Sequence, residues 1–165
     1  APSLWLALLA RLAAAGQVVL RGAVVHLPSH GAQLSATEER IAQKVAPALA
    51  SAGFEGAWAR DLARDAGEPE PLVRTTLSRL ARRGELHQVV KDLFYPLPAM
   101  AQLAALARQV GQAHHGVVLA AQFRDMTGLG RKRAIQILEY FDRIGFTRRV
   151  ADMHRLRGDC TLFEV

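Results

Sequence analysis

The stretch of sequence that decides the fold runs from Gln122 to Arg149 and reads QFRDMTGLGRKRAIQILEYFDRIGFTRR. Residues 121–127 are predicted to form a short helix, which the turn Gly128-Leu-Gly130 ends. Residues 131–144 then carry apolar side chains at spacings of three and four, the period of a helix with one buried face. Gly145 stands where a left-handed residue commonly ends a helix. The stretch therefore predicts a helix-turn-helix followed by an extended segment.

The end of this stretch has two earlier counterparts in the chain. Apolar residues three positions apart precede a glycine in each case, at Leu9/Leu12 with Gly16, Leu77/Leu80 with Gly84, and Leu138/Phe141 with Gly145. Two short segments that resemble strands follow each glycine with a turn between them, at residues 18–20 and 23–27, 86–90 and 93–95, and 146–150 and 154–156, which predicts a β-hairpin. A helix, a glycine and a hairpin in this order are the end of a winged helix, and their recurrence indicates tandem modules.

We therefore predict a mainly α (α+β) fold of tandem winged-helix modules, each with a helix-turn-helix core and a short antiparallel hairpin as its wing. Half of the residues are hydrophobic but only 6% are aromatic, which favours helical packing over a sandwich or barrel. The predicted modules span residues 1–31, 32–97 and 98–165, and the first contains only a last helix and a wing. Because the linkers are short, we expect the modules to stack.

The charge balance favours a polyanionic partner. The 165 residues carry a net charge of +6, and the segment 124–157 holds nine Lys or Arg against four Asp or Glu, an excess of five. The middle module also has a basic stripe, but its arginines have acidic neighbours and are expected to be solvated or paired within the molecule; they are Arg74, Arg79, Arg82 and Arg83. We therefore expect the last module to be the main nucleic-acid-binding module.

Residues of two kinds are candidates for contact in the last module. The helix start at Gly130 is expected to place unbonded N–H groups beside Arg131 and Lys132, an arrangement that suits a phosphate. The polar face of the same helix continues to Arg143, and such a face is the usual reader in this fold. In the wing, strand alternation puts Arg148 and Arg149 on opposite faces, so only one of them can lie beside Thr147. The pattern alone also fits a solvated face that binds nothing.

Other chemistry has little support in the sequence. Cys160 is the only cysteine and has no histidine base nearby, and His114-His115 has no set of Cys or carboxylate partners, so we expect no metal site. No phosphate-binding loop GxxxxGK[ST] and no catalytic constellation occurs, so we expect neither a cofactor nor enzymatic activity. No apolar run approaches the roughly 20 residues of a membrane span. Tyr140 remains a weaker candidate for stacking on a base.

Residues 121–157 resemble the last winged helix of the bacterial selenocysteine-specific elongation factor. The resemblance is carried by Ala121–Asp125, by Gly130–Arg149 and by His154–Arg157. Over residues 1–97 it rests only on the repeat and on the order of the elements. This family joins a GTPase body to four winged helices, whose last module holds the tip of an mRNA stem-loop next to a UGA codon that is read as selenocysteine.

The resemblance implies that the chain is the end of the second winged helix with the third and fourth, a binding fragment without the GTPase. The expected partners are the mRNA stem-loop and, through the full-length factor, the ribosome; GTP and selenocysteinyl-tRNA would bind the missing domains. We expect a cytoplasmic monomer with no membrane contact. Motif position and the helix start predict these RNA-binding residues: Arg124, Gly130, Arg131, Lys132, Arg143, Arg148, Arg149, His154, Arg155 and Arg157.

Two other functions fit the predicted fold. A double-stranded-DNA-binding transcription regulator would place the third helix of a module in a major groove. Such regulators usually dimerise to match a two-fold site, and no dimerisation helix is evident in the sequence. Stacked winged helices also serve as protein-interaction scaffolds. Competition between hairpin RNA, duplex DNA and single-stranded RNA separates the three functions.

Overall fold

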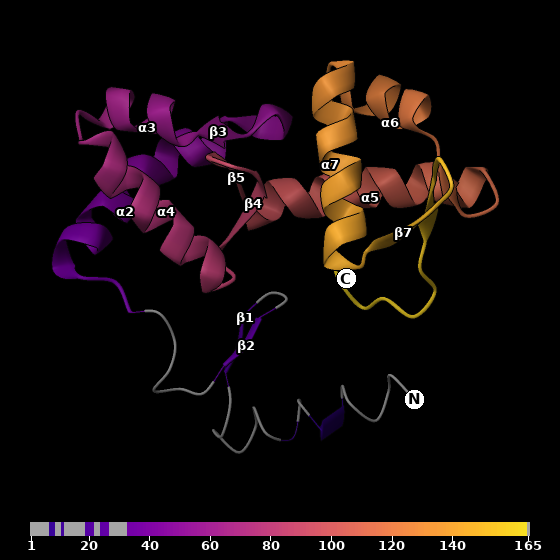
Figure 1. Cartoon of the computed structure of the whole chain (residues 1–165), viewed down its shortest axis with the longest axis horizontal. Coiled ribbons are helices and arrows are strands. Elements are labelled where there is room, and N and C mark those ends of the chain that lie inside the picture. The colour runs from indigo at the N-terminus through magenta and orange to yellow at the C-terminus, as the bar shows by residue number, and fades with distance from the viewer. Residues whose placement is uncertain (1–6, 9–10, 12–18, 22–23, 27–32, 165) are drawn as a thin grey trace.

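The computed structural model describes residues 7–8, 11, 19–21, 24–26 and 33–164 (Figure 1). Its middle part contains three helices and a three-stranded antiparallel sheet with strand order β3-β5-β4. The elements are α2 (Ala36–Ser51), the 3-10 turn η2 (Gly53–Glu55), β3 (Ala57–Trp58), α3 (Ala59–Ala66), α4 (Glu70–Arg82), β4 (Leu86–Val90) and β5 (Leu93–Pro96).

The C-terminal part repeats this order of elements. It contains α5 (Leu97–Ala113), β6 (Val117–Val118), α6 (Ala120–Thr127), α7 (Arg131–Ile144), β7 (Thr147–Val150) and β8 (Met153–Leu156). Its antiparallel sheet has the order β6-β8-β7, which corresponds strand by strand to that of the middle part. Helix, strand, two helices and a hairpin thus occur twice, and the prediction of tandem winged helices is confirmed.

The N-terminal part is described only in short pieces. β1 (Val19–Arg21) and β2 (Val24–His26) form an antiparallel pair, as predicted for a wing. The predicted closing helix around Leu9–Leu12 and the rest of the predicted first module lie mostly outside the described residues.

Local sequence signals explain where the main helices begin and end. The Ser35 hydroxyl accepts a hydrogen bond from the Glu38 N–H, and the Glu38 carboxylate accepts one from the Ser35 N–H, both at 3.1 Å. This capping box satisfies two N–H groups that have no partner inside α2. Gly145 ends α7 with a φ of 85°, a conformation that a residue without a Cβ adopts at little cost.

The two modules are joined without a linker and share one hydrophobic core. β5 ends at Pro96 and α5 begins at Leu97. Val89, Leu93 and Tyr95 belong to the sheet of the middle module, yet they pack in one buried cluster with α5 and α7. The predicted stacking therefore occurs through a continuous apolar core.

Polar contacts on α7 complete this junction. Arg133 donates to the Glu55 carbonyl, and its guanidinium lies 5.5 Å from the centre of the Trp58 ring. The Tyr140 hydroxyl lies 2.6 Å from His87 Nδ1, and burial raises the pKa of Tyr140 to about 12 and lowers that of His87 to about 4. Tyr140 is only 7% exposed. The interpretation of Tyr140 as a base-stacking residue is therefore wrong, because its ring is buried in the junction.

Candidate nucleic-acid interface

Four of the predicted contact residues lie together where α6 meets the start of α7. Gly130 is the N-cap of α7, and no side chain caps the amides of the first turn. Arg131 and Lys132 follow; both are exposed, and neither side chain has a hydrogen bond or ion pair with another described residue. Arg124 reaches the same place from α6. We call Arg124, Gly130, Arg131 and Lys132 the helix-end group.

The helix-end group borders a hollow of about 280 Å³. Arg124 and Arg131 stand on its sides, and Ala120, Ala134 and Ile135 contribute small or apolar walls. Arg124 also lies 3.5 Å from Asp125, but both side chains are well exposed, so this pair is weak. Uncapped amides, the positive end of the helix dipole and the guanidiniums of Arg124 and Arg131 meet here, with Lys132 exposed on the same first turn; this is an arrangement that binds a phosphate.

A second set of predicted residues lies on the wing. The strand register places Arg148 of β7 directly opposite Arg155 of β8. Arg157 follows β8 by one residue, and the three side chains line one hollow of about 670 Å³. We call Arg148, Arg155 and Arg157 the wing group. Arg157 is held by two hydrogen bonds to Asp159 at 3.1 and 2.8 Å, which raise the pKa of Arg157 and lower that of Asp159.

His154 lies at the base of the wing and not on its outer face. Its Nδ1 is 2.7 Å from Asp142 Oδ2, and the other oxygen of Asp142 accepts a hydrogen bond from the Thr147 hydroxyl at 2.6 Å. His154 is 8% exposed and Thr147 is 1% exposed. We call Asp142, Thr147 and His154 the wing clamp. The structure therefore assigns His154 to joining both wing strands to α7, which corrects its prediction as a surface contact.

The two remaining predicted residues have other partners. Arg149 is exposed on the face opposite Arg148, as strand alternation predicted, and its Nε donates to the Ala151 carbonyl at 3.2 Å. Arg143 Nη2 donates to the Val89 carbonyl at 2.6 Å, and the guanidinium lies 5.1 Å from the centre of the Tyr140 ring. Arg143 thus faces the middle module in addition to solvent.

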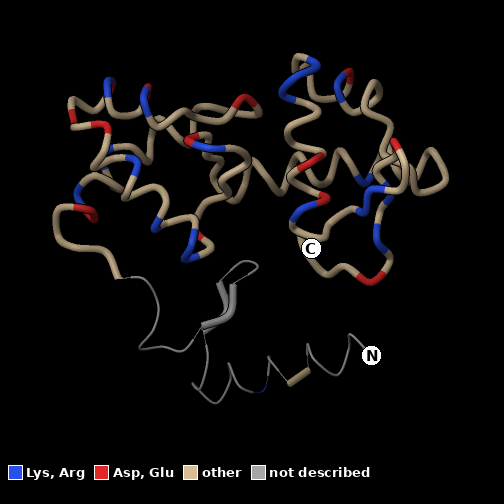
Figure 2. Tube along the Cα trace, viewed as in Figure 1, with Lys and Arg blue, Asp and Glu red and all other residues tan. Residues whose placement is uncertain are grey.

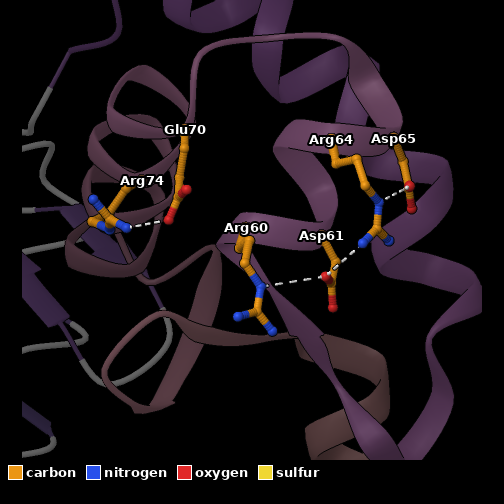
Figure 3. A network of polar contacts seen from close by, with 6 residues as sticks. All are labelled: Arg60, Asp61, Arg64, Asp65, Glu70 and Arg74. Carbon is orange, nitrogen blue, oxygen red and sulfur yellow. Dashed lines mark hydrogen bonds and ion pairs between the residues drawn. The ribbon is translucent and has the colours of Figure 1, made fainter.

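Most of the arginines of the middle module are paired, as the sequence predicted. Arg79 contacts the buried Glu38 at 2.8 Å, and Arg83 contacts Glu85 at 3.1 Å. Figure 3 shows a further network on the surface: Arg64 bonds Asp61 and Asp65, Arg60 lies 3.7 Å from Asp61, and Arg74 bonds Glu70. Arg82 and Lys91 are exposed and make no ion pair with a described residue.

The distribution of charge differs between the two modules (Figure 2). In the middle module blue and red segments alternate, whereas the last module has blue segments at the start of α7 and along the wing. Two features of this surface were not predicted from the sequence. Val150 and Met153, at the tip of the wing, are 39% and 41% exposed on the same strand face as Arg148 and Arg155. Arg133 was counted among the nine basic residues of the segment 124–157, but it is bound to the middle module.

The described residues contain no helix long and apolar enough to cross a membrane. Within the same residues there is no cluster of three or more His, Cys, Asp or Glu side chains with the arrangement of a metal site.

Two family models match the two described modules. Residues 34–95 match the "Selenocysteine-specific elongation factor, winged helix domain", and residues 112–156 match "Elongation factor SelB, winged helix". The chain is 42% identical over 161 residues, or 98% of its length, to the selenocysteine-specific elongation factor of Escherichia coli (strain K12), and 32% identical over 141 residues to that of Haemophilus influenzae. It spans 25% and 22% of these two relatives, respectively.

A solved structure covers the same region. It is described as the mRNA-binding domain of elongation factor SelB from E. coli in complex with SECIS RNA. The match has a TM-score of 0.69 and 44% sequence identity, and it covers 75% of this chain and 99% of that one. On this agreement of sequence, module order and structure, the chain belongs to the winged-helix region of the selenocysteine-specific elongation factor family.

Proposed function

We propose that this chain binds the selenocysteine-insertion hairpin of an mRNA, next to a UGA codon. The observation that carries the proposal is the helix-end group, whose exposed Arg131 and Lys132 have no protein partner among the described residues. This group lies in a module that belongs to the same family as the domain solved with SECIS RNA. A hairpin loop offers splayed bases, and its stem offers phosphates, which are the features that RNA-binding modules read.

In this proposal some of the predicted residues contact RNA and others hold the module in shape, according to their surroundings. The helix-end group contacts the tip of the hairpin directly, and the exposed wing arginines provide positive charge for nucleic acid beyond the tip; they are Arg148, Arg149, Arg155 and Arg157. His154 and Arg143 hold the wing and α7 in position through their protein contacts. Residues 98–165 are then the main RNA-binding module, and residues 32–97 form the module that carries it, preceded by the end of another at 1–31.

The rest of the proposal concerns the full-length protein. The chain corresponds to about a quarter of the length of its relatives, and we assign GTP and selenocysteinyl-tRNA to the other three quarters. The hairpin would then hold the GTPase and its charged tRNA at the UGA codon on the ribosome, in the cytoplasm. By itself the chain is a monomeric binding fragment, and we expect it neither to hydrolyse GTP nor to cleave RNA.

Competition between nucleic acids tests the proposal. A labelled hairpin bound to the chain is challenged with unlabelled hairpin RNA, duplex DNA of equal length, and single-stranded RNA. We expect the hairpin to compete at much lower concentration than the other two. Equal or better competition by duplex DNA would support the transcription-regulator alternative instead and would overturn the proposal.

The salt dependence of hairpin binding is a second test. If the helix-end cations neutralise phosphates of the hairpin, the logarithm of the association constant falls linearly with the logarithm of the salt concentration, by about 0.7 to 0.9 per contact. A slope of several units is expected. An affinity that stays constant between low and physiological salt would contradict the electrostatic part of the proposal.

A further inference from the structure

The helix-end group and the wing group lie near opposite ends of α7. The helix has 14 residues, and a rise of 1.5 Å per residue makes it about 20 Å long. Glu139 is exposed on α7 between the two groups, and Figure 2 shows red segments on the helix between its blue ends. The carboxylate of Glu139 opposes a phosphate track that would run along α7 from one group to the other.

The wing group contains an unfavourable pair that the protein itself does not neutralise. Arg148 and Arg155 are direct cross-strand neighbours, and like charges in this position destabilise a sheet. The Arg148 side chain has no hydrogen bond or ion pair with another described residue, and the Arg155 guanidinium donates only to the His115 carbonyl, at 3.4 Å. No carboxylate among the described residues pairs with either side chain. A phosphate between the two guanidiniums would relieve the repulsion.

The surroundings of this pair indicate which part of a nucleic acid fits. The hollow that Arg148, Arg155 and Arg157 line is about 670 Å³, and Val150 and Leu156 contribute apolar wall. The carboxylate of Asp159 also lines the hollow, where it is paired with Arg157 at 2.8 Å. No aromatic residue lines the hollow, so it lacks a platform on which bases stack. Guanidiniums beside short apolar side chains suit the phosphates and sugars of a backbone and leave the sequence unread.

We propose that the wing group is a second RNA site, which binds a phosphodiester backbone segment other than the one held by the helix-end group. This inference rests on the proposed function and adds a second contact to it. The segment comes either from the lower stem of the same hairpin RNA or from a separate RNA. In both cases the site strengthens binding without regard to base sequence.

The test uses the full chain with Arg148→Gln and Arg155→Gln combined. Both side chains are exposed, so the double variant is expected to fold, and thermal unfolding verifies this. The matched control is Arg82→Gln with Lys91→Gln in the middle module, which removes the same charge from exposed positions. Three probes are titrated: a short hairpin, the same hairpin with its stem lengthened by one helical turn, and an RNA duplex added to the preformed complex with the short hairpin.

We expect the wing variant to bind the short hairpin within about twofold of the unsubstituted chain. Either the longer hairpin or the added duplex then binds roughly tenfold more weakly, and its salt slope falls by one to two units, about one per lost phosphate contact. If the wing variant loses affinity for the longer hairpin, the backbone segment bound by the wing group belongs to the same RNA. If it loses affinity for the added duplex, the segment belongs to a separate RNA. The control variant leaves all three affinities nearly unchanged.

Two results would overturn the inference. If the short hairpin is weakened as much as the longer probes, the wing belongs to the hairpin-tip site. If neither longer probe is affected, the wing group binds no backbone segment. Failure of the proposed function would look different. In that case the unsubstituted chain itself would not prefer the short hairpin over duplex DNA or single-stranded RNA.

Discussion

Helix α7 begins with three consecutive cations, Arg131, Lys132 and Arg133, which lie in different surroundings. Arg131 and Lys132 are exposed beside the uncapped first turn of the helix. Arg133, the next residue, is bound to Glu55 and lies over the Trp58 ring of the middle module. A helix turns by about 100° per residue, so neighbours in sequence face different surroundings. We therefore expect substitutions at these three positions to have different consequences.

Arg131→Ala should weaken hairpin binding. The expected loss is about 1 to 3 kcal/mol if the guanidinium reads a base, with a relaxed preference for the loop sequence, and less if it touches only phosphate. Titration of the original hairpin and of one with an altered loop distinguishes the two cases. A Kd equal to that of the unsubstituted chain with both hairpins would remove Arg131 from the interface.

Arg133→Ala should lower the stability of the fold and have less effect on hairpin binding. The substitution leaves the Glu55 carbonyl and the Trp58 ring without their partner, and a lost hydrogen bond to a charged group costs about 1.5 to 3 kcal/mol. We expect a lower free energy of unfolding in urea, while hairpin affinity at low temperature changes less than in Arg131→Ala. A stability equal to that of the unsubstituted chain would show that the Arg133 contacts contribute nothing to the junction.

In the wing, the sequence predicts which face each side chain occupies but not which residues are paired across the strands. Alternation along β7 was readable from the sequence, and it correctly separated Arg148 from Arg149. The cross-strand partner of each residue was not readable, because register depends on the turn, where Ala151 adopts a φ of 53° without being glycine. Only the paired strands show that Arg148 meets Arg155 and that Arg149 meets His154.

Arg148 and Arg155 repel each other across the two wing strands, so we expect Arg148→Gln to stabilise the fold. Like charges directly opposite one another on a sheet cost about 0.2 to 1 kcal/mol. The variant should therefore unfold at a slightly higher temperature at low salt, and the gain should shrink as added salt screens the charges. Arg149→Gln is the matched control, since its cross-strand neighbour is His154 and not an arginine. A gain of equal size in the control would attribute the effect to net charge alone.

At the scale of the whole molecule, the shared core makes the two described modules mechanically one unit. The helix-turn-helix, the ends of α7 and the hairpins were predictable, because apolar period and glycine position are local signals. The junction was not, because it combines Val89, Tyr95 and Arg133 from distant parts of the chain. His154 was misplaced for the same reason: its partner Asp142 is twelve residues away and on another element.

The buried His87 at this junction predicts a pH dependence of stability. Burial lowers its pKa from 6.5 to about 4, so the unfolded chain takes up the proton before the folded chain does. The stabilising contribution is complete above about pH 6.5 and is lost as the pH falls towards 4, by up to about 3 kcal/mol. Urea titrations near pH 7 and pH 4 measure this loss.

His87→Gln is the comparison for this pH effect. Its side-chain amide can donate a hydrogen bond to the Tyr140 hydroxyl or accept one from it, but it does not titrate. The variant should therefore lose less stability than the unsubstituted chain between the two pH values. An identical loss in both proteins would show that His87 is not the group that destabilises the junction in acid.

The central claim is that the helix-end group of the last module holds the hairpin. Its most direct test is the hairpin affinity of Arg131→Ala with Lys132→Ala, measured beside Arg82→Ala with Lys91→Ala in the full chain. Both double variants lose two positive charges from exposed positions without an ion pair among the described residues. We expect the first to lose at least about 2 kcal/mol of binding free energy, while the second loses a few tenths. Equal losses of binding free energy in the two double variants, or a larger loss in Arg82→Ala with Lys91→Ala, would contradict the account.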